Sequence, residues 1–298
     1  MLPRVLTALV GLPVLAAAIW YGSPWLTLLV LTTAALGVGE FYRLTPPGVG
    51  PLSAGLGTLW VAAMVLGAQA TGSAGGFLLV SAIVWAAGAF VALLWLIGLY
   101  REPVASDQRS VNGHRAPAAG HWLLATAWLL AGPLYVGFLL SHALPLREVG
   151  QATDGAGDMG RLWLLLTVLV TFAADTGAFL VGRTVGHRVI KSGMAPRISP
   201  AKTWEGAVGG FVAAVAAAVA LGLLFGLDVL WWQAAVIGAT VGIVAQCGDL
   251  LESALKRMSN VKDAGSIIPG HGGILDRLDS IVFSLPAVYY LVTIAFGV

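Results

Sequence analysis

LESALKRMSNVKDAGSIIPGHGGILDRLDS, the stretch from Leu251 to Ser280, is strongly polar in an otherwise apolar chain. Only 10% of the 298 residues are charged. The stretch nonetheless holds eight charged side chains: Glu252, Lys256, Arg257, Lys262, Asp263, Asp276, Arg277 and Asp279. Apolar segments flank it on both sides, and charges between membrane spans are costly. We therefore expect this stretch to carry the chemistry of the protein.

The composition around it is typical of a helical membrane protein. Hydrophobic residues make up 58% of the chain and the mean hydropathy is +0.88, whereas soluble chains carry about a quarter charged residues. A formal net charge of +2 gives no reason to expect a nucleic-acid partner, and the single cysteine, Cys247, excludes an internal disulfide.

The apolar residues fall into nine segments of the length that a helix needs to cross about 30 Å of hydrocarbon. They predict an all-α, polytopic integral membrane protein with about nine transmembrane helices. The segments lie near 5–22, 25–42, 55–71, 76–99, 121–144, 161–182, 206–226, 229–250 and 279–298.

Lysines and arginines orient these predicted spans. An odd number of spans places the termini on opposite sides, and the side of the N-terminus would hold 14 of these residues against two, Arg147 and Arg161, on the other. This bias predicts a cytoplasmic N-terminus in a bacterial-type inner membrane, with the active site at the cytoplasmic ends of the C-terminal spans. The loops on that side would be 43–54, 100–120, 183–205 and 251–278.

The polar residues also divide the chain into two parts. Residues 1–160 predict a transmembrane scaffold that faces lipid or a second subunit, which leaves a homodimer open. Residues 161–298 predict the catalytic transmembrane domain, because acidic residues inside apolar spans and dense basic loops begin there.

Asp249 closes the eighth apolar segment. If that helix continues, Asp249, Glu252, Ser253 and Lys256 lie on one face. A carboxylate pair facing solvent at a helix end is the simpler alternative. However, two carboxylates on one face repel each other unless a cation lies between them, which favours a functional role for Asp249.

Asp276 and Asp279 have the same spacing at the start of the last apolar segment. The helix dipole explains one such carboxylate more readily than two. Carboxylates from two helix ends are typical of a Mg²⁺ site for phosphoryl chemistry, and two pairs would also suit two ions.

Two loops could bind phosphates. The run Pro269–Gly273 is a glycine-rich turn whose backbone N–H groups could surround phosphate oxygens, although such turns are also common connectors and His271 alone favours a structural role. In the other loop, Ser199 and Pro200 predict a helix start with Lys202 in its first turn. A lysine there opposes the helix dipole, which favours an anionic ligand, and Glu205 could pair with it.

Asp175 and Glu40 are acidic residues within predicted spans six and two. Either could be a buried polar group that bonds across helices, or part of a functional site. Gly177, two residues after Asp175, predicts close helix packing at this point.

These motifs resemble the signature of the phosphatidate cytidylyltransferases, also called CDP-diacylglycerol synthases. The resemblance covers roughly residues 172–285, and the first 170 residues add only hydropathy and the run Gly39-Glu40-Phe41-Tyr42. It rests on Ala174-Asp175-Thr176-Gly177-Ala178, Ser199-Pro200-x-Lys202-Thr203-Trp204-Glu205-Gly206, Gly248-Asp249-Leu250-x-Glu252-Ser253-x-x-Lys256-Arg257, Lys262-Asp263-x-Gly265 and Ile268-Pro269-Gly270-His271-Gly272-Gly273-x-x-Asp276-Arg277-x-Asp279.

The resemblance implies that CTP and phosphatidic acid react to CDP-diacylglycerol and pyrophosphate, with Mg²⁺, in phospholipid biosynthesis. Asp249 and Asp276 would be the leading metal ligands and Asp279, Glu252 and Asp175 lesser candidates, for one ion, two ions, or one ion plus a monovalent cation. Lys202 and Lys256 would act with Asp249 and Asp276 in catalysis. The substrate-binding residues would be Ser199, Lys202, Thr203, Lys256, Arg257, Lys262, Gly270, His271, Gly272, Gly273 and Arg277.

Two other functions fit the sequence less well. A CDP-alcohol phosphotransferase is disfavoured because Asp154-Gly155 lacks the Ala-Arg that this other family's motif requires. An ion-coupled membrane transporter would use Asp175, Asp249 and Glu40 as an ion path, but the polar residues gather in one half of the chain rather than in two related halves.

Overall fold

A computed structural model describes residues 2–44, 51–71, 74–100, 119–150, 158–270 and 272–297, and this part of the chain is mostly helical. The N-terminal elements are α1 (Leu2–Tyr21), α2 (Trp25–Arg43), α3 (Pro51–Gln69), α4 (Ala74–Tyr100), α5 (Ala119–Gly132), a π-helical turn (Pro133–Phe138), α6 (Leu139–Ser141) and α7 (Ala143–Glu148). The C-terminal elements are α8 (Met159–Val185), β1 (Gly193–Ala195), β2 (Ser199–Thr203), α9 (Trp204–Leu224), α10 (Trp231–Met258), α11 (Leu275–Leu278), α12 (Ile281–Tyr290) and a second π-helical turn (Leu291–Ala295).

All nine predicted apolar segments are helical. Within the described residues, seven helices are long and apolar enough to cross a membrane, and the apolar stretches of α1 and α3 are shorter. The chain is thus an integral membrane protein by length and composition, and the count of nine spans stays a prediction. The predicted span 121–144 is divided at Pro133, whose missing N–H and ring disfavour a regular α-helix, and a π-helical turn follows.

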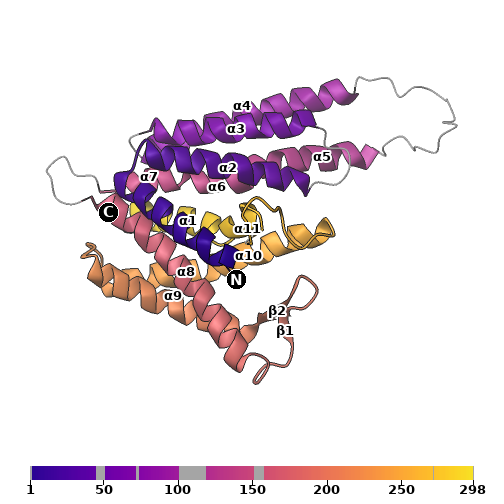
Figure 1. Cartoon of the computed structure of the whole chain (residues 1–298). Helices are drawn as coiled ribbons and strands as arrows, with labels where there is room; N and C mark the ends of the chain where they lie inside the picture. The colour runs from indigo at the N-terminus through magenta and orange to yellow at the C-terminus, as the bar shows by residue number, and fades with distance from the viewer. Residues whose placement is uncertain are drawn as a thin grey trace.

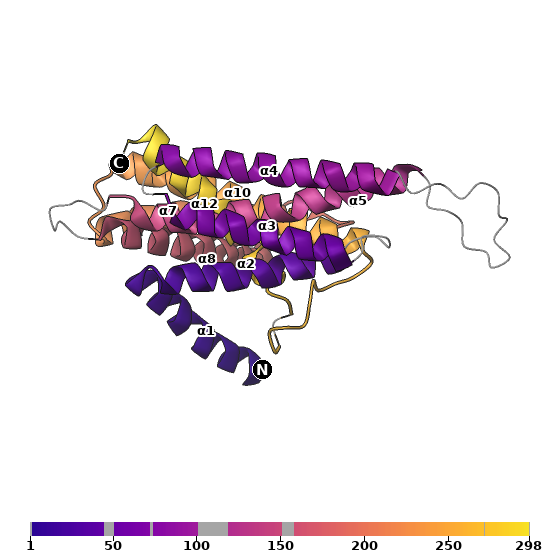
Figure 2. The same ribbon diagram turned by 90° about the horizontal axis from the view of Figure 1, so that it is seen from above.

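The helices form layers (Figure 1). Helices α3 and α4 lie on one side of the bundle, α8 and α9 on the other, and α2, α10 and α11 lie between them. Viewed from above, α1 leaves the bundle at an angle (Figure 2). The helices next to the polar stretch are therefore α1 and α2 from the first half of the chain and α8 to α11 from the second; Thr7 of α1 donates to the carbonyl oxygen of Pro269 at 3.1 Å.

The helix predicted at Ser199 is wrong. Ser199–Thr203 is instead strand β2, which pairs antiparallel with β1, and α9 begins only at Trp204. Thr203 takes the capping role: its hydroxyl accepts the N–H of Gly206 at 3.0 Å. Lys202 therefore lies on a strand rather than in a first helical turn, and the small hairpin adds β-structure to a fold expected to be all-α.

The predicted pair between Glu205 and Lys202 is also wrong. The Glu205 carboxylate accepts the backbone N–H groups of Val189 (3.0 Å) and Ile190 (2.8 Å) and so holds the loop that precedes the hairpin. Lys202 is left to point away from α9, toward α10.

Helices α8 and α9, which precede and follow the hairpin, pack closely against each other. A Cβ on Gly177 would come within 2.5 Å of the Ala213 side chain and 2.9 Å of the Gly209 carbonyl oxygen, so only glycine fits. The close packing predicted from Gly177 is thus confirmed. It fixes Asp175, two residues earlier, beside the same interface.

Arg147 joins three helices at the end of the bundle where α7 lies. It is 6% exposed, donates from Nε to the carbonyl oxygen of Ile19 at the end of α1 (2.9 Å), and pairs with Asp158, the N-cap of α8. The carboxylate also accepts the N–H of Arg161 at 3.3 Å. Helices α1, α7 and α8 therefore share one ionic contact.

Replacing Arg147 with alanine should destabilise the protein. The change leaves Asp158 without its cation and the α1 carbonyl without a donor, and breaking such a buried pair costs about 3 kcal/mol. Unfolding in detergent measures the loss, with Arg43→Ala, which removes an exposed arginine, as the matched control. Equal stability of the two variants would contradict this role.

Candidate active site

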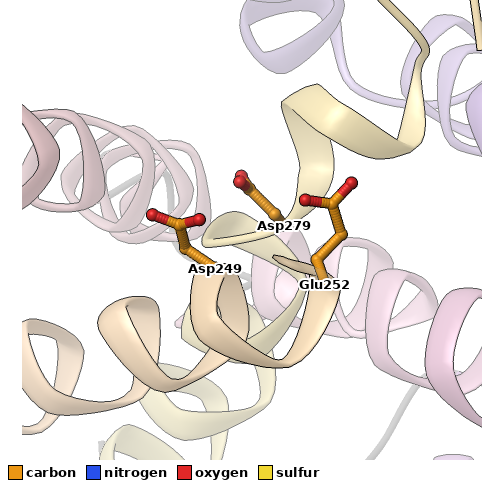
Figure 3. Close-up of side chains that lie close together, drawn as sticks. All are labelled: Asp249, Glu252 and Asp279. Atoms are coloured by element: carbon orange, nitrogen blue, oxygen red, sulfur yellow. The ribbon is translucent and has the colours of Figure 1, made fainter. Parts of the chain in front are cut away.

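Three carboxylates from two segments meet at the centre of the polar stretch. Asp249 and Glu252 lie on α10, which continues to Met258 as the same-face spacing required, and Asp279 follows α11. One oxygen from each lies within 4.8 Å of the others. Figure 3 shows the three carboxyl groups directed toward a common space. We call this group the carboxylate cluster.

Two lysines offset part of the negative charge. Lys202 Nζ lies 2.7 Å from Asp249 Oδ2, and Lys256 Nζ lies 2.6 Å from Glu252 Oε2. Lys256 also pairs with Asp276 Oδ1 at 2.7 Å, so its charge is shared between two carboxylates. The cluster therefore keeps an excess of negative charge, which a bound cation would neutralise.

The chemistry of the cluster fits a divalent cation. Glu252 is fully buried, and neither of its carboxyl oxygens has a hydrogen-bond donor among the described residues, apart from the ion pair with Lys256. All three groups offer hard oxygen ligands, which Mg²⁺ prefers. Asp249, Glu252 and Asp279 could therefore hold a metal ion.

Asp276 lies beside the cluster and is held by the protein itself. Its Oδ2 accepts the N–H groups of Ala264 (3.0 Å) and Gly273 (2.8 Å), while Oδ1 pairs with Lys256. Both oxygens are thus engaged, and Asp276 is not in the group of three. The expectation that Asp249 and Asp276 lead the metal site changes accordingly: the geometry favours Asp279 and Glu252 as the partners of Asp249.

Asp175 lies on the other side of the cluster, on α8. Its Oδ1 accepts a hydrogen bond from the hydroxyl of Ser280 at 3.2 Å, which ties α8 to the residue after Asp279. Ser280 was not singled out in the sequence, because a serine in a helical turn has no distinctive pattern. Asp175 therefore makes a bond across helices, but it is exposed and lines the cavity, so both interpretations of this residue stay open.

A cavity of about 740 Å³ opens beside these residues. It lies between α8, β2, α10 and α11, and Thr203 and Arg183 are also on its wall. The charged residues on its wall that the sequence predicted are Asp175, Lys202, Asp249, Asp276, Arg277 and Asp279. Arg183, which sequence reasoning did not assign to the site, follows the sixth predicted span as a basic residue at its end.

An apolar groove of about 470 Å³ adjoins this cavity. Helices α1, α2, α8 and α12 line it, mostly with leucine, isoleucine and valine side chains. Phe172 and Arg277 belong to both walls. The cavity with charged walls and the apolar groove thus adjoin at Phe172 and Arg277.

The other described residues that were predicted to bind substrate are absent from the cavity wall. Lys256 is enclosed between carboxylates, and Lys262 is exposed on the loop. Arg257 donates to the carbonyl oxygens of Ile198 (3.2 Å) and Val261 (3.3 Å), which joins the hairpin region to the end of α10. Ser199 is likewise absent from the wall.

The glycine-rich turn has the backbone that was predicted for it. Gly270 and Gly272 have positive φ angles of 76° and 84°, which glycine adopts readily. The N–H of Gly273 is directed to Asp276 and is therefore not free for a phosphate. His271 lies outside the described residues.

Glu40 is absent from the wall of the polar cavity. Asp175 and Asp249 do line that cavity, so the three acidic residues of the transporter hypothesis do not lie on one cavity wall. The Glu40 side chain instead contacts the backbone at the start of α11, where its Oε2 accepts the N–H of Leu275 at 2.8 Å.

Comparison with known proteins identifies related chains. The family model described as "Cytidylyltransferase family" matches residues 2–295. A Bacillus subtilis protein named phosphatidate cytidylyltransferase is 37% identical over 161 residues, which are 54% of this chain and 56% of that protein. Proteins of the same name from Synechocystis and Staphylococcus saprophyticus are 37% and 40% identical, over 55% and 44% of this chain and 61% and 49% of theirs. The chain thus spans about half to three fifths of the length of these relatives.

Metal binding should depend on the cluster more than on Asp276. Asp249→Asn and Asp279→Asn should each weaken Mn²⁺ binding at least about tenfold, because each removes an anionic ligand. Asp276→Asn should weaken it less, since both of its oxygens already have protein partners.

Electron paramagnetic resonance titration of the detergent-solubilised protein measures this affinity. Asp228→Asn, which changes an exposed aspartate between α9 and α10, is the control. Loss of binding in Asp276→Asn together with normal binding in Asp279→Asn would make Asp276 the ligand.

Proposed function

The chain belongs to the cytidylyltransferase family, and on that basis we propose that it is a phosphatidate cytidylyltransferase. It would convert CTP and phosphatidic acid into CDP-diacylglycerol and pyrophosphate. The names of the relatives support this reaction, as does the sequence resemblance across 172–285.

The meeting of the polar cavity with the apolar groove is the observation that carries the proposal. Binding a nucleoside triphosphate requires cationic side chains and carboxylates that hold a metal ion, whereas binding acyl chains requires an apolar surface. Arg277 and Phe172 lie where the two spaces join. A lipid phosphate held at Arg277 would therefore face the cavity while its acyl chains lie in the groove.

Binding in the cavity follows from the charges on its wall. Arg277 offers a planar guanidinium that can bind a phosphate through two hydrogen bonds. Lys202 on β2 would contact the triphosphate from the opposite side, next to Asp249. Lys256 would neutralise carboxylates rather than bind the substrate, because it is paired with both Glu252 and Asp276.

The reaction requires no nucleophilic side chain. An oxygen of the lipid phosphate, already ionised, forms a bond to the α-phosphorus of CTP as the bond to the β-phosphate oxygen breaks, and pyrophosphate leaves. Asp249, Glu252 and Asp279 would hold Mg²⁺, which neutralises charge on the phosphates when bound. Lys202 and Arg277 reduce the repulsion between the two polyanions and orient them.

We place the site on the cytoplasmic side of a bacterial-type inner membrane, where CTP is available and where the basic loops predict it to lie. Residues 161–298 would supply the charged groups. The scaffold of residues 1–160 has a further role in this proposal, because α1 and α2 form one wall of the groove.

Product formation tests the proposal. Purified protein should form CDP-diacylglycerol only when CTP, phosphatidic acid and Mg²⁺ are all present, and Asp249→Asn should lower turnover at least about 100-fold. Extraction of labelled lipid with parallel detection of pyrophosphate measures both products. Folded protein that forms neither product with all three components present would contradict the assignment.

A bulky side chain in the groove should weaken the binding of phosphatidate and leave the binding of CTP unchanged. Gly11 lies on the groove wall, and a Cβ there meets no atom within 4 Å, so the position has room for a side chain and Gly11→Phe would place a ring at the groove. The KM for long-chain phosphatidate should rise about tenfold, equivalent to about 1.4 kcal/mol, with the KM for CTP unchanged. Gly55→Phe on α3, equally open but remote from the groove, is the control. A rise in the KM for CTP instead would contradict the role of the groove.

A further inference from the structure

Glu40 connects the first half of the chain to the candidate active site. It lies near the end of α2 and is 1% exposed, and its Oε2 accepts the N–H of Leu275, the first residue of α11, at 2.8 Å. No described lysine, arginine or histidine side chain lies within ion-pair distance of it. Burying a carboxylate costs free energy unless it is paired or hydrogen-bonded. The burial of Glu40 with no described cationic side chain beside it therefore requires an explanation.

Two glycines enclose the Glu40 carboxylate. A Cβ on Gly265 would collide with Oε1, and a Cβ on Gly273 would collide with Oε2. Neither glycine has a positive φ angle, so backbone conformation does not call for glycine at either position. The absence of side chains here instead lets the loop backbone approach the carboxylate.

The same loop segments hold Asp276 on their other side. Ala264, next to Gly265, and Gly273 itself donate their N–H groups to Asp276 Oδ2. Asp276 in turn pairs with Lys256, which pairs with Glu252 of the carboxylate cluster. A continuous set of contacts therefore runs from α2 to the cluster.

We propose that Glu40 is a positioning residue for the reaction proposed above, on which this inference rests. Its carboxylate fixes the loop and the start of α11 against α2, and so sets the place of Asp276 and Lys256 relative to the cluster. It does not line the cavity, so it would act through these residues rather than on the substrate. Without it, the loop would shift, and a displacement of about 1 Å at reacting groups can cost about 100-fold in rate.

Alanine and glutamine variants separate positioning from direct action. Glu40→Ala removes the acceptor for the Leu275 N–H and should lower kcat about 100-fold, with both KM values changed less than about threefold. Glu40→Gln keeps an oxygen acceptor and should retain kcat within about fivefold. A glutamine variant as inactive as the alanine variant, with both eluting as folded protein, would overturn the proposal in favour of a charge-dependent role.

A double-mutant cycle tests the contact itself and does not depend on whether Glu40→Ala folds. Gly265→Ala places a methyl group against Oε1 and should lower kcat. Glu40→Asp shortens the side chain, so in the double variant the methyl group gains room. The double variant should be more active than the product of the two single effects predicts. If the two single effects on kcat simply multiply in the double variant, the proposed contact between Glu40 and Gly265 is wrong.

A third measurement is independent of the reaction. Lys262 is exposed on the loop that Glu40 holds, so trypsin should cleave there faster in Glu40→Ala than in the wild type. Glu148→Ala, in α7 at the other end of the bundle, is the control (Figure 1). Faster cleavage only in Glu40→Ala supports positioning even where no CDP-diacylglycerol forms, and equal cleavage in the two variants overturns it.

Discussion

Mutual repulsion among Asp249, Glu252 and Asp279 is the constraint on which the rest of the structure depends. Three carboxylates within 4.8 Å of one another at helix ends are stable only with positive charge near them. The fold supplies part of that charge from two directions, Lys202 from the hairpin and Lys256 from α10 itself. A divalent cation would supply the rest, which is why we propose the cluster as the metal site of the reaction.

The same constraint explains the parts that surround the cluster. The hairpin carries Lys202 to Asp249 of α10, and α8 packs closely on α9, the helix that follows the hairpin. Asp276 holds the loop by its backbone and shares Lys256 with Glu252, while Glu40 holds that loop from α2. Beyond the cluster, Arg277 marks the change from polar cavity to apolar groove. In the function proposed here, the nucleotide and the lipid would therefore meet where these two spaces join.

The features that could be predicted from the sequence are those that depend on local residue pattern. Apolar segment length predicted the helices, and helical spacing placed Asp249 and Glu252 on one face. The sequence ranked Asp276 above Asp279 as a metal ligand, and it could not show that the backbone N–H groups of Ala264 and Gly273 donate to Asp276, on which our proposal of Asp279 rests. The residues around Ser199 fit both a helix cap and a strand, and pairing with β1 decided between them. The Glu40 contact spans 235 positions in the chain and leaves no local signal.

The position of a bound metal ion tests the central claim most directly. Protein crystallised with Mn²⁺ would show the ion by its anomalous scattering. We expect the peak between the carboxyl groups of Asp249, Glu252 and Asp279, with Lys256 remaining against Asp276. A peak coordinated by Asp276 or Asp175 in place of Glu252 and Asp279 would contradict the arrangement proposed for the site.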